Sequence, residues 1–153
     1  MANAKSDITV GAELDRIAGE FLRAVSFEAG QSPPYENIRE LFIESGLLIK
    51  NVGTKPEIST VSEFITPRQA QVDSGALVRF HESEISKRTV IFGNIAHRFS
   101  AYKKSGTLNG TTFDARGMIS TQFVLTPTGW KMSSMAWDDE RTGLQIPDEY
   151  LSS

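Results

Sequence analysis

The sequence predicts an α+β fold in which helices come first and a curved antiparallel sheet follows. Apolar residues recur with a helical period in the first part of the chain, whereas long strand-like segments joined by turn residues begin at Leu77. Strands and helices do not alternate, so a parallel sheet of βαβ units is not expected. Helices packed on one face of a bent sheet satisfy these observations.

Two helices are predicted before residue 42. The first presents one apolar face, because its large apolar residues fall three or four positions apart. These residues are Leu14, Ile17, Ala18, Phe21 and Val25. Gly30 is placed to end this helix. Pro33 and Pro34 then lead into a short second helix at residues 35–41, since a first helical turn does not need the N–H that proline lacks.

A third helix is predicted from two capping boxes. Thr60 with Glu63, and Thr66 with Gln69, each pair a hydroxyl acceptor with a side chain that can reach back to the cap. The helix is expected at about residues 61–74.

The second half of the chain is predicted to be an antiparallel meander. Glycine, asparagine and proline concentrate at residues 93–94, 105–110 and 127–129, and each group indicates a turn between strands. One short strand is predicted earlier, at residues 46–52, where an apolar run is too short for a helix.

Length and composition suit one globular domain. The chain has 153 residues, of which 39% are hydrophobic and 23% charged. The domain is expected to occupy residues 1–153, with a core at about 8–141 and loosely held, polar termini.

Charge and residue content narrow the expected partners. A net charge of -3 gives no long-range attraction for phosphate groups, so nucleic acid is not an expected partner. The absence of cysteine excludes disulfides and thiol chemistry. No apolar run is long enough for a membrane span, and residues 1–7 lack the apolar part of a signal peptide. We therefore expect a cytoplasmic protein with no membrane partner.

Turn geometry predicts which side chains share a face of the sheet. A two-residue loop at 93–94 pairs Phe92 with Ile95. It also pairs Val90 with His97, and the apolar neighbours of this pair predict that His97 faces the core. In the last hairpin we assume an even-numbered loop. A three-residue loop without a compensating bulge reverses the facing of that hairpin.

The two faces are expected to differ in chemistry. The inward face is apolar with isolated polar groups, as in a ligand pocket. Its expected pocket residues are Arg88, Phe99, Thr121, Trp130, Met132 and Ser134. The outward face is rich in aromatic, methionine and arginine side chains, which are enriched at protein interfaces. The expected homodimer interface consists of Arg98, Tyr102, Arg116, Met118, Ser120, Gln122, Met135 and Trp137.

Three segments carry a family resemblance: GNIAHRFSAY at residues 93–102, RGMISTQF at 116–123, and the ending at 130–141 that contains WDDER. Together with the helices before them, they resemble the nuclear transport factor 2-like superfamily, in its SnoaL-like branch, over about residues 14–141. The resemblance implies a cone-shaped, cystatin-like barrel in which a curved sheet wraps a long helix around a cavity. It also implies frequent homodimerisation through the outer sheet face.

The resemblance does not select a reaction. The superfamily contains ketosteroid isomerases, polyketide cyclases, scytalone dehydratases and epoxide hydrolases, together with pocket proteins that have no assigned activity. A shared fold therefore leaves the chemistry to be argued from the site itself.

His97 is the leading catalytic candidate. It is the central one of two histidines, and an imidazole suits a general acid or base near neutral pH. Its partner would be Glu84, on the neighbouring strand, or Asp138, at the end of the last strand. The alternative is a core histidine bonded to backbone or water. With two histidines at no recurrent spacing, neither a metal site nor a cofactor is expected.

Two functional interpretations remain open. In the first, a SnoaL-like protein binds a small apolar organic ligand and catalyses proton transfer on it, as an isomerase, cyclase or dehydratase does. In the second, the domain is a non-catalytic binding or dimerisation module whose cavity is filled by its own side chains. An open cavity where His97 meets a carboxylate favours the first. A filled core in which His97 bonds to backbone favours the second.

Overall fold

A computed structural model of the chain describes residues 4–152, with side chains from residue 7 onward. The ends of the predicted domain, residues 1–3 and 153, lie outside the described residues. In chain order the elements are α1 (Ala4–Val25), the 3-10 helix η1 (Tyr35–Leu41), β1 (Phe42–Lys50), β2 (Glu57–Thr60), α2 (Val61–Asp73), β3 (Leu77–Phe92), β4 (Ile95–Leu108), β5 (Thr111–Thr126), β6 (Gly129–Asp139) and the 3-10 helix η2 (Asp148–Tyr150).

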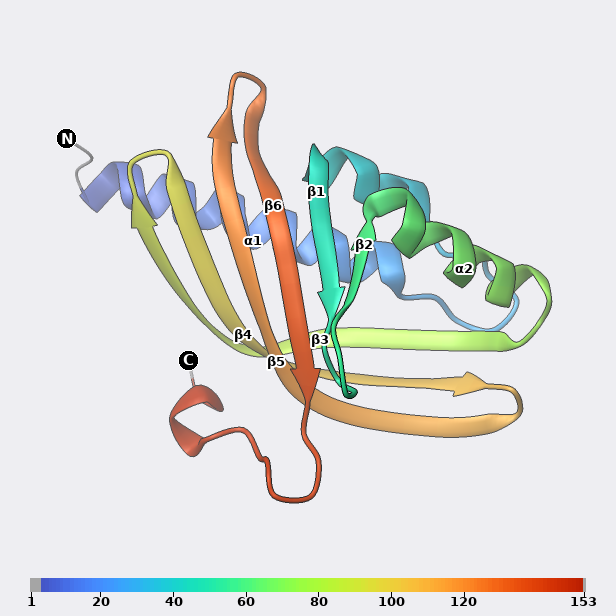
Figure 1. Cartoon of the computed structure of the whole chain (residues 1–153). Coiled ribbons are helices and arrows are strands. Elements are labelled where there is room, and N and C mark those ends of the chain that lie inside the picture. Colours follow the sequence, from blue (N-terminus) through green and yellow to red (C-terminus); the bar gives the residue numbers. More distant parts are fainter. Residues whose placement is uncertain (1–3, 153) are drawn as a thin grey trace.

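One curved, unclosed sheet wraps the helices (Figure 1). Its strand order is β2-β1-β6-β5-β4-β3, and the β1–β6 pair alone is parallel. The long strands β3, β4 and β5 bend sharply, so that one half of each strand passes α1 and the other half runs beneath α2. The predicted α+β fold with N-terminal helices and a strongly curved antiparallel sheet is confirmed.

The core forms where α1 lies in the concave side of the sheet. Leu14, Ile17, Phe21 and Val25 are all buried, which confirms the predicted apolar face of this helix. They form one cluster with η1, α2 and the inner face of the strands. Burial of this kind supplies most of the free energy that holds α1 in place.

The start of α2 is fixed by one of the two predicted capping boxes. The N–H of Glu63 donates to Thr60 Oγ1 at 3.1 Å, and the N–H of Thr60 donates to Glu63 Oε1 at 3.0 Å. The second predicted box is wrong, because Thr66 lies inside the helix. The side chain of Gln69 instead donates to Asp73, one turn later.

The turns agree with the sequence prediction except in one place. Gly93 and Asn94 link β3 to β4, and the pairs Phe92–Ile95 and Val90–His97 are confirmed. The predicted turn at 105–110 is shorter in the structure, because β4 continues to Leu108. Asn109 and Gly110, both with positive φ, make the two-residue turn.

A bulge in β6 changes which side chains face inward. Phe123 pairs with Met132, but Gln122 pairs with Ser134, so Ser133 is an extra residue. Beyond it, Met135 pairs with buried Thr121, whereas Ser134 pairs with exposed Gln122. The predicted inward facing of Ser134 and outward facing of Met135 are therefore wrong.

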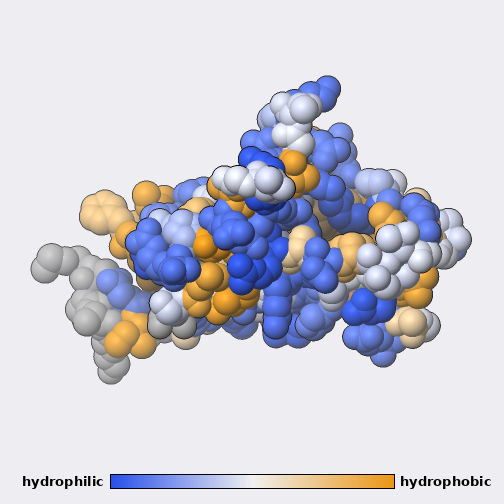
Figure 2. Space-filling view, turned by 90° about the horizontal axis from the view of Figure 1, so that it is seen from below, coloured by the Kyte–Doolittle hydropathy of each residue, from blue (hydrophilic) through white to orange (hydrophobic). Residues whose placement is uncertain are grey.

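The predicted facing of the β3–β4 hairpin is also reversed. His97 is exposed, and its neighbours on the same face, Val90, Phe92 and Ile95, are 56%, 82% and 58% exposed. Hydrophobic residues accordingly reach the surface near the end of the molecule that carries the β3–β4 turn (Figures 1 and 2). The inward side chain is Arg98, which is 3% exposed and is paired with two carboxylates.

The C-terminal tail docks on the outer face of the sheet instead of lying loose. The hydroxyl of Ser86 donates to the Tyr150 carbonyl oxygen, and Arg88 Nη2 donates to the Glu149 carbonyl oxygen at 2.6 Å. The rings of Phe99 and Tyr150 meet edge to face with centroids 5.3 Å apart. These contacts cover part of the face on which a homodimer interface was predicted.

Candidate functional site

The main cavity lies between the bent half of the sheet and the helices, and its volume is about 460 Å³. This volume is within the range of small-molecule sites in proteins. Its wall is mostly apolar and aromatic, with polar side chains from η1, from α2 and from five strands. The polar and charged lining residues are Tyr35, Lys50, Arg68, Gln71, Glu82, Lys104, Asp114 and Asp139.

Aromatic rings make two sides of the cavity. Phe64 of α2 lies edge to face against Trp137 of β6, with ring centroids 6.2 Å apart. Across the bent half of the sheet, Phe80 of β3 and Phe113 of β5 lie at the same centroid separation of 6.2 Å. A flat apolar molecule gains dispersion and burial against such walls.

Glu82 is the carboxyl group whose proton affinity is most altered. It sits in β3 opposite Lys104 of β4, and its own N–H donates to Ser26 Oγ at 3.1 Å. Burial raises the pKa of Glu82 to about 7, with a contribution from the negative charge of Asp139, while Lys104 and Arg68 oppose the shift. A carboxyl group with this pKa can both give and accept a proton near neutral pH.

A second carboxylate in the cavity is held in place by two partners. Lys104 Nζ lies 3.1 Å from Asp139 Oδ1, and the hydroxyl of Tyr102 donates to the same carboxylate. Burial and the bond to Asp139 raise the pKa of the Tyr102 hydroxyl. Gly117 makes this arrangement possible, because a Cβ there would lie 2.3 Å from the Tyr102 hydroxyl oxygen.

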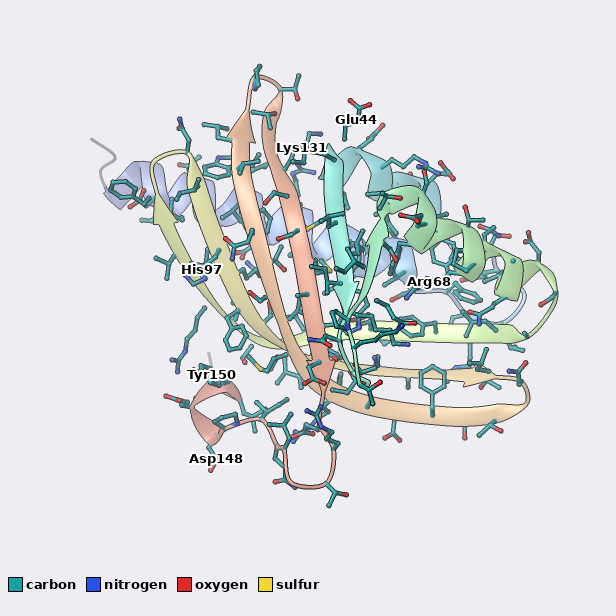
Figure 3. All side chains as sticks on the ribbon, in the orientation of Figure 1. Glu44, Arg68, His97, Lys131, Asp148 and Tyr150 are labelled. Atoms are coloured by element: carbon teal, nitrogen blue, oxygen red, sulfur yellow. The ribbon has the colours of Figure 1, made fainter. Side chains whose placement is uncertain are left out.

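Arg68 lines the cavity from α2, on its helical side. Figure 3 shows it between α2 and β3. Its Nη1 donates to the Phe64 carbonyl oxygen at 3.0 Å, and its guanidinium carbon lies 3.7 Å from the centroid of the Phe64 ring. Among residues 7–152 no carboxylate forms an ion pair with Arg68. Burial lowers the pKa of its guanidinium.

The residues predicted as catalytic do not meet in this cavity. His97 is exposed on the outer face, and Figure 3 shows it on the opposite side of the molecule from Arg68. Glu84 does turn inward, but it pairs with Arg98 Nη2 at 2.7 Å. Asp138 pairs with Arg141 at 2.7 Å and does not line the cavity. The predicted convergence of His97 with a carboxylate is wrong, because Arg98 takes the inward position.

The predicted pocket residues are distributed over several places. Thr121 and Met132 face inward and line a second, much smaller cavity beside Arg98. Trp130 is buried in the core and lines neither cavity. The prediction is wrong for Arg88 and Phe99, because both lie on the outer face and contact the docked tail.

The predicted interface residues divide in the same way. Four of them are inside the protein, which corrects their predicted facing: Arg98, Tyr102 and Met135 are buried, and Trp137 lines the cavity. The other four lie on the outer side by alternation along β5; they are Arg116, Met118, Ser120 and Gln122. Arg116 there forms an ion pair with Glu140 at 2.9 Å.

Sequence reasoning missed most of the charged groups that line the cavity. One available signal was that Glu82 and Glu84 share a strand face by their spacing of two, and both do turn inward. Another was the acidic run after Trp137, in which Asp139 proves to line the cavity. No local sequence pattern indicated that Arg68 or Lys104 would line the cavity.

Two further observations on the part of the chain that the structure describes concern metal ions and membranes. No group of three histidine, aspartate or glutamate side chains there could hold a metal ion. None of the described helices has the length and apolar character needed to cross a membrane.

Comparison with known proteins gives similarity at the level of structure. No protein-family model matches the sequence, and no curated protein matches it either. A nuclear transport factor 2-like superfamily protein from Salmonella enterica superposes with a TM-score of 0.72 at 16% identity, covering 92% of this chain and 99% of its own.

Two other similar structures carry enzyme names. A "putative scytalone dehydratase" from Novosphingobium aromaticivorans superposes with a TM-score of 0.71 at 9% identity, covering 95% of this chain and 94% of its own. A "putative dehydratase" of the NTF2-like family from Streptomyces avermitilis has a TM-score of 0.67 at 14% identity, covering 88% and 99%. The helices, the curved sheet and these superpositions agree, so the chain has the nuclear transport factor 2-like fold.

Proposed function

We propose that this protein binds a small, largely apolar organic molecule in the main cavity and transfers a proton on it, with Glu82 as the general acid or base. The observation that carries the proposal is the position of one carboxyl group, Glu82, in the wall of a 460 Å³ cavity whose other walls are mainly apolar. A carboxylate removed from water and facing an apolar ligand is a stronger base than the same group in solvent.

The surroundings of Glu82 fit such a role. Lys104 and Arg68 are placed to stabilise negative charge that develops on a ligand as its proton leaves, and both line the same cavity as Glu82. Asp139 is already bonded to Tyr102 and Lys104, which makes it the less available base. Asp114, the third carboxyl group of the wall, is exposed, so proton transfer falls on Glu82.

The names of the similar structures agree with proton-transfer chemistry but do not identify the reaction. Two of the similar structures carry dehydratase names. A dehydration removes a proton from carbon and delivers one to the leaving hydroxyl, so it needs an acid or base of the kind that Glu82 supplies. Isomerisation and cyclisation need the same group, and the substrate decides among them.

The second candidate is a non-catalytic binding protein. The main cavity has about 460 Å³ of space, which does not favour a domain filled by its own side chains. A binding protein without chemistry needs the same space and the same apolar walls. The two candidates differ in whether Glu82 moves a proton.

The experiment is a proton-abstraction assay with nitrobenzisoxazole as the probe. A base takes the carbon-bound proton of this compound, the electron pair of that C–H bond forms the nitrile, and the N–O bond breaks to release a coloured phenolate. We expect the rate to rise with pH through an apparent pKa near 7, set by Glu82. In the Glu82→Gln variant it should fall by about 100-fold or more, the usual contribution of a positioned base.

Glu44→Gln is the matched control, because Glu44 is an exposed glutamate outside the cavity (Figure 3). Its rate should equal that of the unmodified protein. An equal rate for Glu82→Gln, measured on protein shown to be folded by circular dichroism, overturns the catalytic proposal. If that variant also retains binding of the probe, the non-catalytic candidate takes its place.

A further inference from the structure

We infer that the natural ligand is a monoanionic carboxylic acid with an apolar, flat body, and that Arg68 binds its carboxylate. This inference rests on the proposed function in one respect, namely that the main cavity is the ligand site. It adds the chemical class of the ligand and the residue that binds its carboxylate.

The first support is the state of Arg68. This side chain is half-buried, lines the cavity and forms no ion pair with any described carboxylate. Its one hydrogen bond to a described residue joins Nη1 to the Phe64 carbonyl oxygen, so Nε and Nη2 have no acceptor among residues 7–152. A guanidinium that is removed from water and lacks an anion is costly, and a bound carboxylate would offset that cost.

The second support is the orientation of the guanidinium. It stacks over the Phe64 ring at 3.7 Å, and the same ring contacts Trp137. Stacking fixes the plane of the donor fork, so the two N–H groups of one edge are available to a planar carboxylate. The apolar body of such a ligand then extends along the aromatic wall.

The third support is the balance of charge around the cavity. Three cations line it, namely Lys50, Arg68 and Lys104. Lys104 is neutralised by Asp139, and Glu82 carries a proton for part of the time near neutral pH. Asp114, the third carboxylate of the wall, balances one of the two remaining cations, so the protonated fraction of Glu82 leaves a small excess of positive charge, which favours an anion over a cationic ligand.

The same balance favours a single charge. A phosphate group carries nearly two negative charges at neutral pH and is usually met by several donors and cations. Here Arg68 is the sole arginine in the described cavity wall, and Glu82 shares that wall with its own negative charge when ionised. A carboxylate therefore fits the single guanidinium group of Arg68 better than a phosphate does.

The experiment compares acids with their neutral amides of the same shape. Phenylacetate, naphthoate and anthracene carboxylate are titrated into the protein beside phenylacetamide, naphthamide and anthracene carboxamide, with calorimetry as the readout. We expect at least one acid to bind about tenfold or more tightly than its amide, as expected for a charge-assisted pair of hydrogen bonds.

Three variants assign the preference to Arg68. Arg68→Met keeps a long apolar side chain against Phe64 and should abolish the preference, whereas Arg68→Lys keeps the charge and should retain part of it. Arg39→Met is the control, because Arg39 pairs with Glu36 on η1 outside the cavity. It should leave the preference unchanged.

Each outcome decides a different point. Equal binding of acids and amides by the unmodified protein overturns the anion inference and leaves the cavity as a binding site for neutral molecules. Binding of no acid and no amide of any size overturns both the inference and the proposed function. A preference that survives in Arg68→Met overturns the assignment to Arg68. Because the first comparison uses the unmodified protein, a variant that fails to fold does not prevent the test.

Discussion

Replacing Glu82 with glutamine should change how the stability of the protein depends on pH. The pKa of Glu82 is raised from 4.5 to about 7 by burial in the cavity wall. The folded protein therefore keeps a proton that the unfolded chain has already lost in this pH range. Stability falls with rising pH wherever the folded state binds more protons, so ionisation of Glu82 destabilises the fold between about pH 4.5 and pH 7.

The magnitude follows from the pKa itself. One pKa unit is worth about 1.4 kcal/mol, so a rise from 4.5 to about 7 corresponds to about 3 kcal/mol of lost stability once Glu82 is fully ionised. Glutamine has nearly the same shape and does not ionise. Glu82→Gln should therefore match the unmodified protein at about pH 4, below the pKa of both states, and exceed it in stability by about 3 kcal/mol at about pH 8.

Urea unfolding followed by circular dichroism across this pH range measures the difference. The charges that face Glu82 come from three elements, Lys104 on β4, Asp139 on β6 and Arg68 on α2, and all of them are kept in the variant. Glu44→Gln again serves as the control for loss of an exposed carboxylate. A stability difference between Glu82→Gln and the unmodified protein that stays constant from about pH 5 to pH 8 would refute the assignment of a raised pKa to Glu82.

Three shorter predictions concern the fold and the assembly. Gly117→Ala should destabilise the protein by about 1–3 kcal/mol in chemical unfolding, because the new Cβ would lie 2.2 Å from the Asp138 carbonyl oxygen and 2.3 Å from the Tyr102 hydroxyl. His97→Phe should change the unfolding free energy by no more than about 0.5 kcal/mol, because His97 is exposed; a larger loss would contradict that placement. A homodimer through the outer sheet face stays a prediction: light scattering should show a dimer that Phe92→Glu dissociates, and a monomer without the substitution would oppose it.

The sequence predicted the three helices and the antiparallel pairing of β3 to β6, because those depend on local patterns, whereas β2 and the parallel β1–β6 pair were not predicted and β1 begins at Phe42 instead of residue 46. The apolar period of Leu14, Ile17 and Phe21 indicates a helix face directly, and that face is buried. The glycine at position 93 determines a two-residue turn, and the turn sets the pairing of Val90 with His97. Neither inference requires knowledge of distant residues.

The facing of the strands could not be predicted in the same way. A bulge shifts the alternation by one residue, and Ser133 carries no local sign that it is the extra residue in β6. The charged groups of the cavity could not be predicted from local sequence either. Glu82, Lys104 and Asp139 come from three strands and meet only because the sheet bends. These contacts depend on the curvature of the whole sheet.

Arg98 is the clearest example of a side chain whose facing could not be predicted from the sequence, because its burial reversed the predicted face of β4. An apolar face normally turns inward, yet Val90, Phe92 and Ile95 are exposed while Arg98 is 3% exposed. Arg98 Nη1 lies 2.6 Å from Asp15 on α1, and Nη2 lies 2.7 Å from Glu84 on β3. A buried arginine is tolerated when it is paired, and the carboxylate of Asp15 comes from a helix 83 positions away in the chain.

Substitution of Arg98 tests this explanation. Arg98→Met should lower the unfolding free energy by about 3 kcal/mol or more, because Glu84 would be left as an unpaired, largely buried charge. Asp15 would suffer less, since it is 45% exposed and keeps Lys87 as a partner. The double variant Arg98→Met with Glu84→Gln removes both charges and should recover most of the loss. If the single variant costs less than about 1 kcal/mol, or the double variant recovers nothing, the ion pair does not hold this face of β4 inward.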